Sequence, residues 1–330
     1  MNLQTQYLGL TLKNPLIVGA SPLCDNTLVA QQLEQAGAAA VVMRSLFEEQ
    51  IDAEQQALVR HTEASAESHP EATSYWPAYE EYQLGTDQYL RQLGRLKRTL
   101  SIPVIASLNG CSPGGWTSYA RRFEMEGADA VELNLYQLIT DPALSGDEVE
   151  AALVRTVEDV VKSVRIPVAV KLSPFHTSLV PFAMELVGAG AAGIVLFNRF
   201  YQPDFNLEDL EVQPQLRLSD SGELLLRLRW LAIISPHLRG SLAASGGVHS
   251  ASDVVKSILA GAHAVQVVSA VLKHGPQILT TMLKELTNWL SEHDYTRIGQ
   301  LRGAMNMRRC PDPAAFERAN YIRILQSWKA

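Results

Sequence analysis

The 330-residue sequence contains few cysteines, no tract of basic residues and no long apolar run free of helix breakers. Cys24, Cys111 and Cys310 lie far apart and include no Cys-x-x-Cys pair, which argues against a disulfide framework and a zinc site. No metal is expected, and the low cysteine usage fits the reducing cytoplasm. The 28 Lys and Arg residues are outnumbered by 35 Asp and Glu residues. This acidic balance gives no electrostatic reason to expect a nucleic acid partner and favours a small-molecule substrate.

Export and membrane insertion are not expected either. The N-terminal residues lack the basic and apolar regions of a signal peptide. The most apolar stretch, residues 179–197, contains Pro181, Glu185 and three glycines, which would interrupt a membrane-spanning helix. This stretch instead predicts a helix that ends at a glycine and is followed by a buried strand.

Four segments of the chain repeat one pattern, in which a short turn of small residues precedes a run of strand-forming residues. They begin at Gly37, Gly127, Gly190 and Gly261. Glycine suits the left-handed conformation that ends many helices, and the run after it has the length of a strand covered on both faces. Each copy therefore predicts the end of a helix followed by a buried strand.

Four further apolar segments alternate with these copies, namely residues 15–19, 102–106, 166–170 and 242–245. Eight short buried strands, most of them joined by helices, predict an α/β fold in which parallel strands close into a (β/α)8 TIM barrel. An open doubly wound sheet has the same local signals. However, no Gly-x-Gly-x-x-Gly follows the first strand, and the strand count is eight. The barrel is therefore the expected fold.

The barrel is expected over about residues 13–290, within a single domain that spans residues 1–330. Long βα loops are expected at residues 46–88, after the second strand, and at residues 198–228, after the sixth. Both loops fall on the face where TIM barrels carry their active sites. Residues 6–12, centred on Gly9, predict an N-terminal β-hairpin that caps the opposite end of the barrel.

The C-terminal extension, residues 303–330, carries four large apolar side chains at near-helical spacing. These are Phe316, Tyr321, Ile324 and Trp328. We expect them to cover the barrel, with a surface for a partner as the alternative. An oligomer is compatible with the sequence.

Lys171 is the most informative residue among those that end the predicted strands. It lies between Val170 and Leu172, so it either points into the barrel mouth or carries a large desolvation cost. We expect it to face a ligand anion or a carboxylate. An ion pair with Glu132, on the preceding strand, is an alternative that is compatible with this role.

Glycines and small polar residues follow the last two strands. Residues 245–250 read Ser-Gly-Gly-Val-His-Ser before a helix opened by Asp253, and Val268 and Ser269 follow the eighth strand. Glycines let backbone N–H groups approach a phosphate, and this is the usual phosphate site of TIM barrels. The residues alone therefore predict a phosphorylated ligand beside a lysine, which leaves FMN, pyridoxal phosphate and a sugar phosphate open.

Several of these segments together resemble the flavin-dependent dihydroorotate dehydrogenases, over about residues 3–290. The segments are Asn14–Ser21, Glu132–Leu135, Val170–Pro174, Gly246–Val248 and Val268–Ala270. Residues 41–50, 108–110 and 196–203 are similar to a branch of the family known as dihydroorotate dehydrogenase-like proteins. The resemblance implies an FMN-binding TIM barrel that oxidises or reduces a carbon–carbon bond, as in pyrimidine biosynthesis.

The resemblance also implies roles for individual residues. Lys171 would contact the N1/O2 edge of the flavin and stabilise negative charge there. The residues that would line the flavin ring are Ala20, Ser21, Ser45 and Asn134, and those that would hold its phosphate are Gly246, Gly247, Val268 and Ser269. Asn198 falls where the family places a substrate-binding asparagine. We expect Arg44, Asn109, Asn134 and Arg199 to be further polar contacts to substrate, because an anionic substrate needs fixed donors.

Other positions depart from the family pattern. The family's catalytic base is Cys or Ser shortly after the Asn-Leu pair, whereas residues 136–139 here are Tyr-Gln-Leu-Ile. Arg44 replaces a lysine that the family has at the end of the second strand. The asparagine that the family has in the loop after this strand is missing from residues 74–79. Residues 221–225 replace a glycine-rich phosphate loop. The candidates for the missing acid or base are Tyr136, His176 and Cys111.

The expected function is therefore an FMN-dependent oxidoreductase that acts on a small carboxylated or pyrimidine-like substrate, with dihydroorotate as one candidate. One alternative is a sugar-phosphate aldolase or isomerase that uses Lys171 as a Schiff-base nucleophile. A second alternative is a flavin-binding subunit that has lost its own substrate and serves a larger redox assembly. A redox partner protein is possible in either flavin-dependent case.

Overall fold

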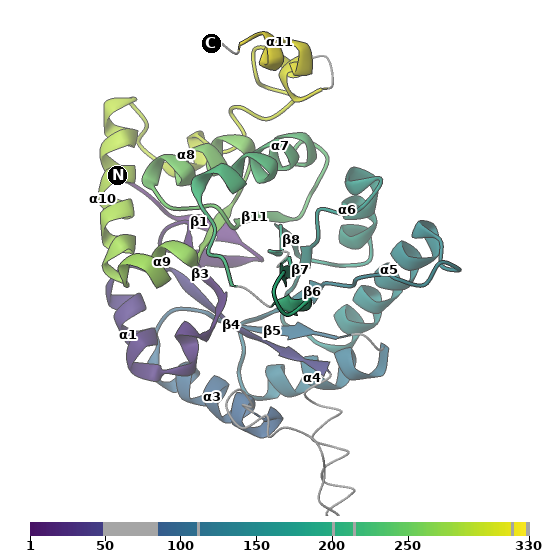
Figure 1. Cartoon of the computed structure of the whole chain (residues 1–330). Coiled ribbons are helices and arrows are strands. Elements are labelled where there is room, and N and C mark those ends of the chain that lie inside the picture. The colour runs from purple at the N-terminus through teal and green to yellow at the C-terminus, as the bar shows by residue number, and fades with distance from the viewer. Residues whose placement is uncertain (49–84, 111–112, 200–201, 214–215, 318–319, 328–330) are drawn as a thin grey trace, which may run out of the picture.

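The computed structural model describes residues 1–48, 85–110, 113–199, 202–213, 216–317 and 320–327. Within these residues, eight parallel strands close into a barrel surrounded by helices (Figure 1). In order around the barrel they are β3 (Leu16–Ser21), β4 (Ala40–Phe47), β5 (Val104–Asn109), β6 (Ala130–Leu135), β7 (Val168–Leu172), β8 (Gly193–Leu196), β11 (Ser241–Ser245) and β12 (Ala264–Val267). Pairing of β12 with β3 closes the ring, which confirms the predicted TIM barrel.

Helices follow the strands and, apart from the last of them, form the outer layer. They are α1 (Thr27–Gln35), α3 (Thr86–Thr99), α4 (Pro113–Met125), α5 (Gly146–Ser163), α6 (Leu179–Gly188), α7 (Leu224–Ile234), α8 (Ala251–Ala260), α9 (Ser269–His274), α10 (Gln277–Glu292) and α11 (Asn320–Gln326). The described residues also form the short 3-10 helices η1 (Pro22–Asp25), η2 (Ser221–Glu223), η3 (Ile298–Gln300) and η4 (Pro313–Phe316). In the described part of the chain, no helix combines the length and apolarity needed to cross a membrane.

The four repeated glycines have the predicted conformation. Their φ angles are +111° at Gly37, +90° at Gly127, +104° at Gly190 and +124° at Gly261, all in the left-handed region. The positive φ disfavours a larger residue at Gly37, and a Cβ atom there would also lie 2.4 Å from the end of the Leu283 side chain, which would have to move. These turns set the start of each following strand and therefore its register in the barrel.

The N-terminal hairpin closes one end of the barrel, as the sequence predicts. Strands β1 (Thr5–Tyr7) and β2 (Leu10–Leu12) pair antiparallel, and Tyr7, Leu8 and Leu12 are buried. They pack against inward-facing side chains near the amino ends of the barrel strands. These are Ile17, Ala40, Val42, Ile105, Ala130, Ala169, Val195, Ala243 and Ala264. This end is apolar and sealed, so a ligand must enter from the carboxyl ends of the strands.

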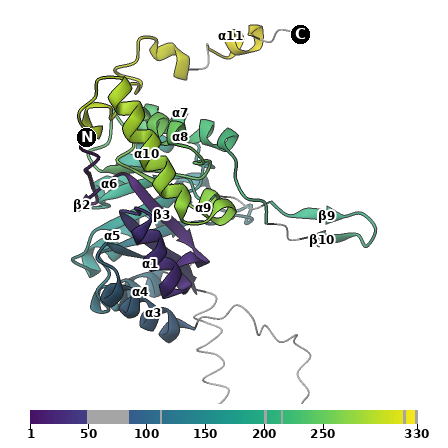
Figure 2. The same ribbon diagram turned by 90° about the vertical axis from the view of Figure 1, so that its left-hand side faces the viewer.

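The predicted long loop after the sixth strand, β8, contains an antiparallel hairpin that was not expected from the sequence. Its strands are β9 (Asp204–Asn206) and β10 (Glu211–Gln213), and it projects away from the barrel (Figure 2). The central part of the other predicted long loop, residues 49–84, lies outside the described residues.

The C-terminal extension covers the barrel only in its first half. Backbone N–H groups of Gly303 and Met305 donate to carbonyls of α8, and Phe316 is partly buried against the core. Tyr321 and Ile324 are instead 64% and 50% exposed, because α11 extends away from the barrel (Figures 1 and 2). The expectation that these two side chains cover the barrel is therefore wrong, and Trp328 lies outside the described residues.

Candidate active site

A pocket of about 520 Å³ opens at the carboxyl ends of the strands. Ten of its lining residues are those that the sequence singles out, namely Ala20, Ser21, Arg44, Ser45, Asn109, Asn134, Tyr136, Lys171, Asn198 and Arg199. They come from six strands or the segments directly after them. Their convergence follows from barrel closure, because the residues after each parallel strand share one end of the ring.

A second pocket, of about 90 Å³, adjoins the first and shares Ala20, Lys171, Asn198 and Arg199 with it. Its remaining residues include the four that were predicted to hold a phosphate, which are Gly246, Gly247, Val268 and Ser269. The mouth therefore combines a wide compartment above Lys171 with a narrow compartment at the glycine turn after β11.

Lys171 is buried in a polar cluster at the centre of the barrel mouth. Its Nζ lies 3.3 Å from Glu132 Oε1 and donates to Gln266 Oε1 at 3.1 Å. Gln266 Nε2 in turn donates to Glu132 Oε2 at 2.5 Å, so the three side chains form a closed ring of contacts. The side chains of Lys171 and Glu132 are only 7% and 1% exposed. The expected ion pair with Glu132 is therefore present, and Lys171 also lines the pocket.

Strand alternation explains this cluster. Ala130, Glu132 and Asn134 take alternate positions on β6, so they point to the same side of the sheet, into the barrel. Asn134 is the register partner of Lys171 on β7. Among the described residues, the Asn134 Oδ1 atom is one of the few buried polar atoms with no hydrogen-bond partner. A buried acceptor of this kind is suited to a donor group on a ligand.

Two arginines flank the wide compartment, and each has a carboxylate partner. Arg44 Nε lies 3.5 Å from Asp25 Oδ1, and Arg199 Nη2 donates to Glu223 Oε1 at 3.1 Å. Burial raises the pKa of Asp25, and the Arg44 guanidinium opposes this rise. The carboxylates fix the directions of both guanidinium groups, which then present fixed cations to the pocket.

The glycine turn after β11 has a backbone that only glycine adopts readily. Gly246 and Gly247 have φ angles of +89° and +79°, and a Cβ atom on Gly247 would lie 2.5 Å from the Leu224 backbone nitrogen. The Gly247 N–H donates to Ser219 Oγ at 3.3 Å, and Ser219 Oγ also contacts Ser269 Oγ at 2.9 Å. Three segments that are distant in the sequence therefore meet at one point.

Two basic side chains stand beside this point. Lys273 Nζ donates to the Ser219 carbonyl at 2.9 Å, and His249 Nε2 lies 3.3 Å from Ser219 Oγ. Burial, followed by the Lys273 charge, lowers the pKa of His249. The Ser219 and Ser269 hydroxyls line the narrow compartment and Lys273 carries a positive charge beside Ser219, an arrangement that suits a phosphate.

Sequence reasoning missed the roles of Ser219, Lys273, His249 and Gln266. Ser219 and Lys273 meet only because the loop after β8 folds back onto α9, a contact across 54 residues. Gln266 follows from no motif, although its inward position on β12 could have been inferred from strand alternation. His249 lies within the predicted phosphate segment, but its contact with Ser219 is visible only in the structure.

His176 lies outside both mouth pockets. It lines a separate pocket of about 260 Å³, where its Nδ1 lies 3.2 Å from Glu150 Oε1 on α5 and its ring packs on Phe182. Burial lowers the pKa of His176, and Glu150 opposes the change. The structure therefore does not bring His176 together with Lys171. Cys111, another candidate for the missing acid or base, lies outside the described residues.

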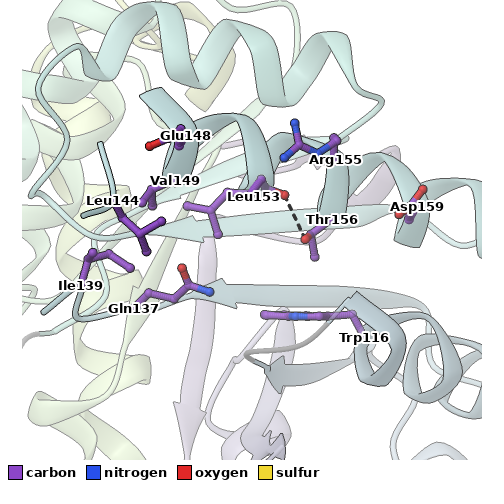
Figure 3. Close-up of a pocket in the computed structure, with 11 residues that line it drawn as sticks. Trp116, Gln137, Ile139, Leu144, Glu148, Val149, Leu153, Arg155, Thr156 and Asp159 are labelled. Atoms are coloured by element: carbon purple, nitrogen blue, oxygen red, sulfur yellow. Dashed lines mark hydrogen bonds between the residues drawn. The ribbon is translucent and has the colours of Figure 1, made fainter. Parts of the chain in front are cut away.

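A further pocket, of about 380 Å³, lies between α4, α5 and the segment after β6 (Figure 3). Trp116, Leu144 and Leu153 give it a largely apolar lining, with Arg155 and Asp159 among its charged residues. Among the described residues, neither this pocket nor the His176 pocket is lined by a buried lysine or by a pair of adjacent glycines. The mouth therefore remains the candidate active site.

A family model described as dihydroorotate dehydrogenase matches residues 2–290. The chain belongs to the dihydroorotate dehydrogenase family. It is 33% identical over 221 residues to a protein of Aeropyrum pernix provisionally named dihydroorotate dehydrogenase A (fumarate), covering 64% of this chain and 71% of the relative.

Other members of the dihydroorotate dehydrogenase family match over more of their length. A dihydroorotate dehydrogenase B (NAD(+)), catalytic subunit, of Thermoplasma volcanium is 25% identical over 315 residues, which cover 92% of this chain and 98% of the relative. The corresponding subunit of Methanocella arvoryzae is 28% identical over 277 residues, which cover 80% and 85%. The chain is therefore an oxidoreductase of a family that acts on CH–CH bonds, and this excludes the aldolase alternative.

Dihydroorotate dehydrogenases are flavin-dependent, and the residues of the mouth fit such a group. The wide compartment falls within the roughly 300–1,000 Å³ of typical ligand sites. Its lining includes the buried Lys171 cation and the unpartnered Oδ1 atom of Asn134, and it adjoins the narrow compartment at the glycine turn. In the described part of the chain, no cluster of His, Cys, Asp and Glu could hold a metal ion.

Proposed function

We propose that this chain binds FMN at the barrel mouth and transfers hydride between the flavin and a small carboxylated or pyrimidine-like substrate. The observation that carries the proposal is the continuity of the two mouth pockets across Lys171. One compartment has the size and polar lining for a ring and a substrate, and the other has the donors for a phosphate. Dihydroorotate, a precursor of pyrimidines, is the first substrate to test.

Each group of residues has a role in this proposal. Ala20, Ser21, Ser45 and Asn134 would line the ring, and Gly246, Gly247, Val268 and Ser269 would hold the phosphate. The bound flavin would supply the hydride acceptor or donor. Lys171 would hold positive charge beside the ring, and Glu132 and Gln266 would fix its position.

The proposed substrate site lies above the ring. Asn109, Asn134 and Asn198 offer amide donors and acceptors, while Arg44 and Arg199 offer cations to a carboxylate. The backbone N–H of Asn198 donates to the Leu172 carbonyl at 2.7 Å, which fixes the start of the loop after β8.

Tyr136 is the proposed proton carrier at the site. Among the described lining residues of the wide compartment, Arg44, Tyr136, Lys171 and Arg199 are the titratable ones. Arginine side chains do not act as proton carriers in proteins, and Lys171 is engaged with Glu132. The Tyr136 hydroxyl is therefore the group best suited to exchange a proton with the substrate. His176 has no role in this proposal because it lines a separate pocket.

The proposal is tested by mixing the FMN-loaded protein, without oxygen, with dihydroorotate and a panel of related carboxylic acids. Bleaching of the flavin by one of these acids is the expected result. A protein that takes up no FMN refutes the flavin site. A yellow protein that no acid bleaches, but that a reduced partner protein bleaches, would favour the flavin-binding subunit of a larger redox assembly.

A further inference from the structure

The hairpin formed by β9 and β10, residues 204–213, has an exposed apolar surface. Phe205 and Val212 are cross-strand partners, so their side chains lie on the same face. They are 68% and 63% exposed, and Leu207 and Leu210 in the connecting turn are 79% and 87% exposed. We call this hairpin the arm. It projects away from the barrel (Figure 2).

The arm is also strongly acidic. Between residues 204 and 213 it has four carboxylates and no basic side chain. Asp204 pairs with Arg217 at the base of the arm, whereas Glu208, Asp209 and Glu211 have no ion pair within the described residues. An isolated two-stranded hairpin is only marginally stable in water. Its apolar face therefore gains most from a partner that also carries positive charge.

The C-terminal segment, residues 303–330, has the complementary properties. Helix α11 has seven residues and buries none of them, and Tyr321, Ile322, Ile324 and Leu325 are each at least half exposed. An isolated helix of this length is not stable in water. From residue 308 onward the segment has five basic residues and two acidic ones. Arg308 and Arg309 are exposed and have no ion pair within the described residues.

We propose that the arm of one copy of this chain binds the C-terminal segment of a second copy. Both elements expose apolar side chains and are weakly stable alone, and their net charges are opposite in sign. Contact between two arms would bring together eight carboxylates, so the charges disfavour that arrangement. Two reciprocal contacts between the arm and the C-terminal segment would close a dimer. The C-terminal segment lies beyond residue 290, where the family match ends.

The arm is joined directly to the candidate active site. Arg199, at the wide compartment, precedes it, and Ser219, at the glycine turn, follows it. A contact at the arm would therefore lie close in the sequence to residues of both mouth pockets. The proposal itself concerns the contact alone and does not depend on the substrate.

The contact is tested with paired charge reversals, measured by analytical ultracentrifugation of the full chain. One variant carries Glu208→Lys and Glu211→Lys on the arm, and the other carries Arg308→Glu and Arg309→Glu on the C-terminal segment. All four side chains are exposed, so the barrel is expected to fold normally. The matched control is Glu285→Lys with Glu292→Lys on α10, which makes the same charge change as the arm variant elsewhere on the surface.

The unmodified chain and the control are expected to dimerise. Each reversal variant alone should associate at least about tenfold more weakly, which corresponds to about 1.4 kcal/mol. An equimolar mixture of the two variants should dimerise again. One of its two contacts then joins an unchanged arm to an unchanged C-terminal segment, and in the other the charges at the substituted positions are again opposite. A monomeric unmodified chain, or a dimer that neither reversal weakens, would overturn the proposal. Failure of the mixture to reassociate would do the same.

Discussion

Replacing Lys171 with methionine is expected to destabilise the protein strongly, because it leaves the Glu132 carboxylate buried without its cation. The Glu132 side chain is 1% exposed, and Lys171 Nζ is 3.3 Å from its Oε1 atom. Gln266 remains as a hydrogen-bond donor to the other carboxylate oxygen. Removing one partner of a buried ion pair typically costs about 3–5 kcal/mol, and we expect a loss of unfolding free energy in that range.

A second substitution distinguishes the loss of stability caused by the buried, unpaired charge from the loss caused by changed packing. Glu132→Gln in the Lys171→Met background removes the unpaired carboxylate and keeps an amide beside Gln266. Replacing both members of a buried pair is often close to neutral, so most of the lost stability is expected to return. Urea unfolding of the single and double variants, without flavin, measures both changes. A loss below about 1 kcal/mol for Lys171→Met, or no recovery in the double variant, would refute this account of the cluster.

The same positions test the electrostatic role of Lys171. Lys171→Met removes the positive charge at the mouth and is expected to lower the midpoint potential of bound flavin. Glu132→Gln alone leaves the lysine charge uncompensated and is expected to raise it. Spectroscopic redox titration measures both shifts. Equal potentials in the two variants would place Lys171 away from the flavin.

Three further predictions concern single residues. Lys273→Gln is expected to weaken FMN binding about tenfold or more, because a charge-assisted hydrogen bond contributes about 1.5–3 kcal/mol, and to leave riboflavin binding unchanged. Lys284→Gln on α10 is its control, and equal losses for FMN and riboflavin would contradict the phosphate site. Tyr136→Phe is expected to lower turnover by about 100-fold or more with FMN binding intact, measured by flavin reduction, and unchanged turnover would exclude Tyr136 as the proton carrier. Burial, followed by the Arg302 charge, lowers the pKa of His263 to about 4, so the folded state keeps this side chain neutral below its ordinary pKa of about 6.5. Stability is then expected to fall by about 3 kcal/mol as the pH drops from about 6.5 to about 4, and His263→Gln should remove this part of the acid sensitivity in pH-dependent unfolding.

Much of the fold and the site could be predicted because a TIM barrel converts local patterns into spatial ones. The repeated glycines mark helix ends with positive φ, and the apolar runs after them have the length and composition of buried strands. Once eight such strands close, residues after distant strands, such as Arg44 and Asn198, must share one mouth. No long-range information was needed for that step.

The position of His176 could not be predicted in the same way. It follows β7 by only a few residues, yet the chain has already turned outward at that point, and the side chain pairs with Glu150 on α5. Nothing in the spacing of these two residues indicates the pair. The bond from Lys273 to Ser219 is equally hidden, because 54 residues separate the two along the chain.

The arm was missed for a different physical reason. Phe205 and Val212 alternate with polar residues, which is a strand signal, but a predicted strand normally requires a core to pack against. The lack of such a core made a loop the simpler expectation. The opposite happened at α11, where apolar residues at helical spacing suggested burial against the barrel and instead remain exposed.

The central claim is that the mouth binds FMN through Lys171 and the glycine turn. The most direct measurement is a titration of the flavin-free protein with FMN, followed by the quenching of flavin fluorescence. We expect one FMN per chain, weaker binding of FMN by Lys273→Gln, and binding by Tyr136→Phe equal to that of the unmodified protein. A protein that binds no FMN, or that binds FMN and riboflavin equally well, would contradict it.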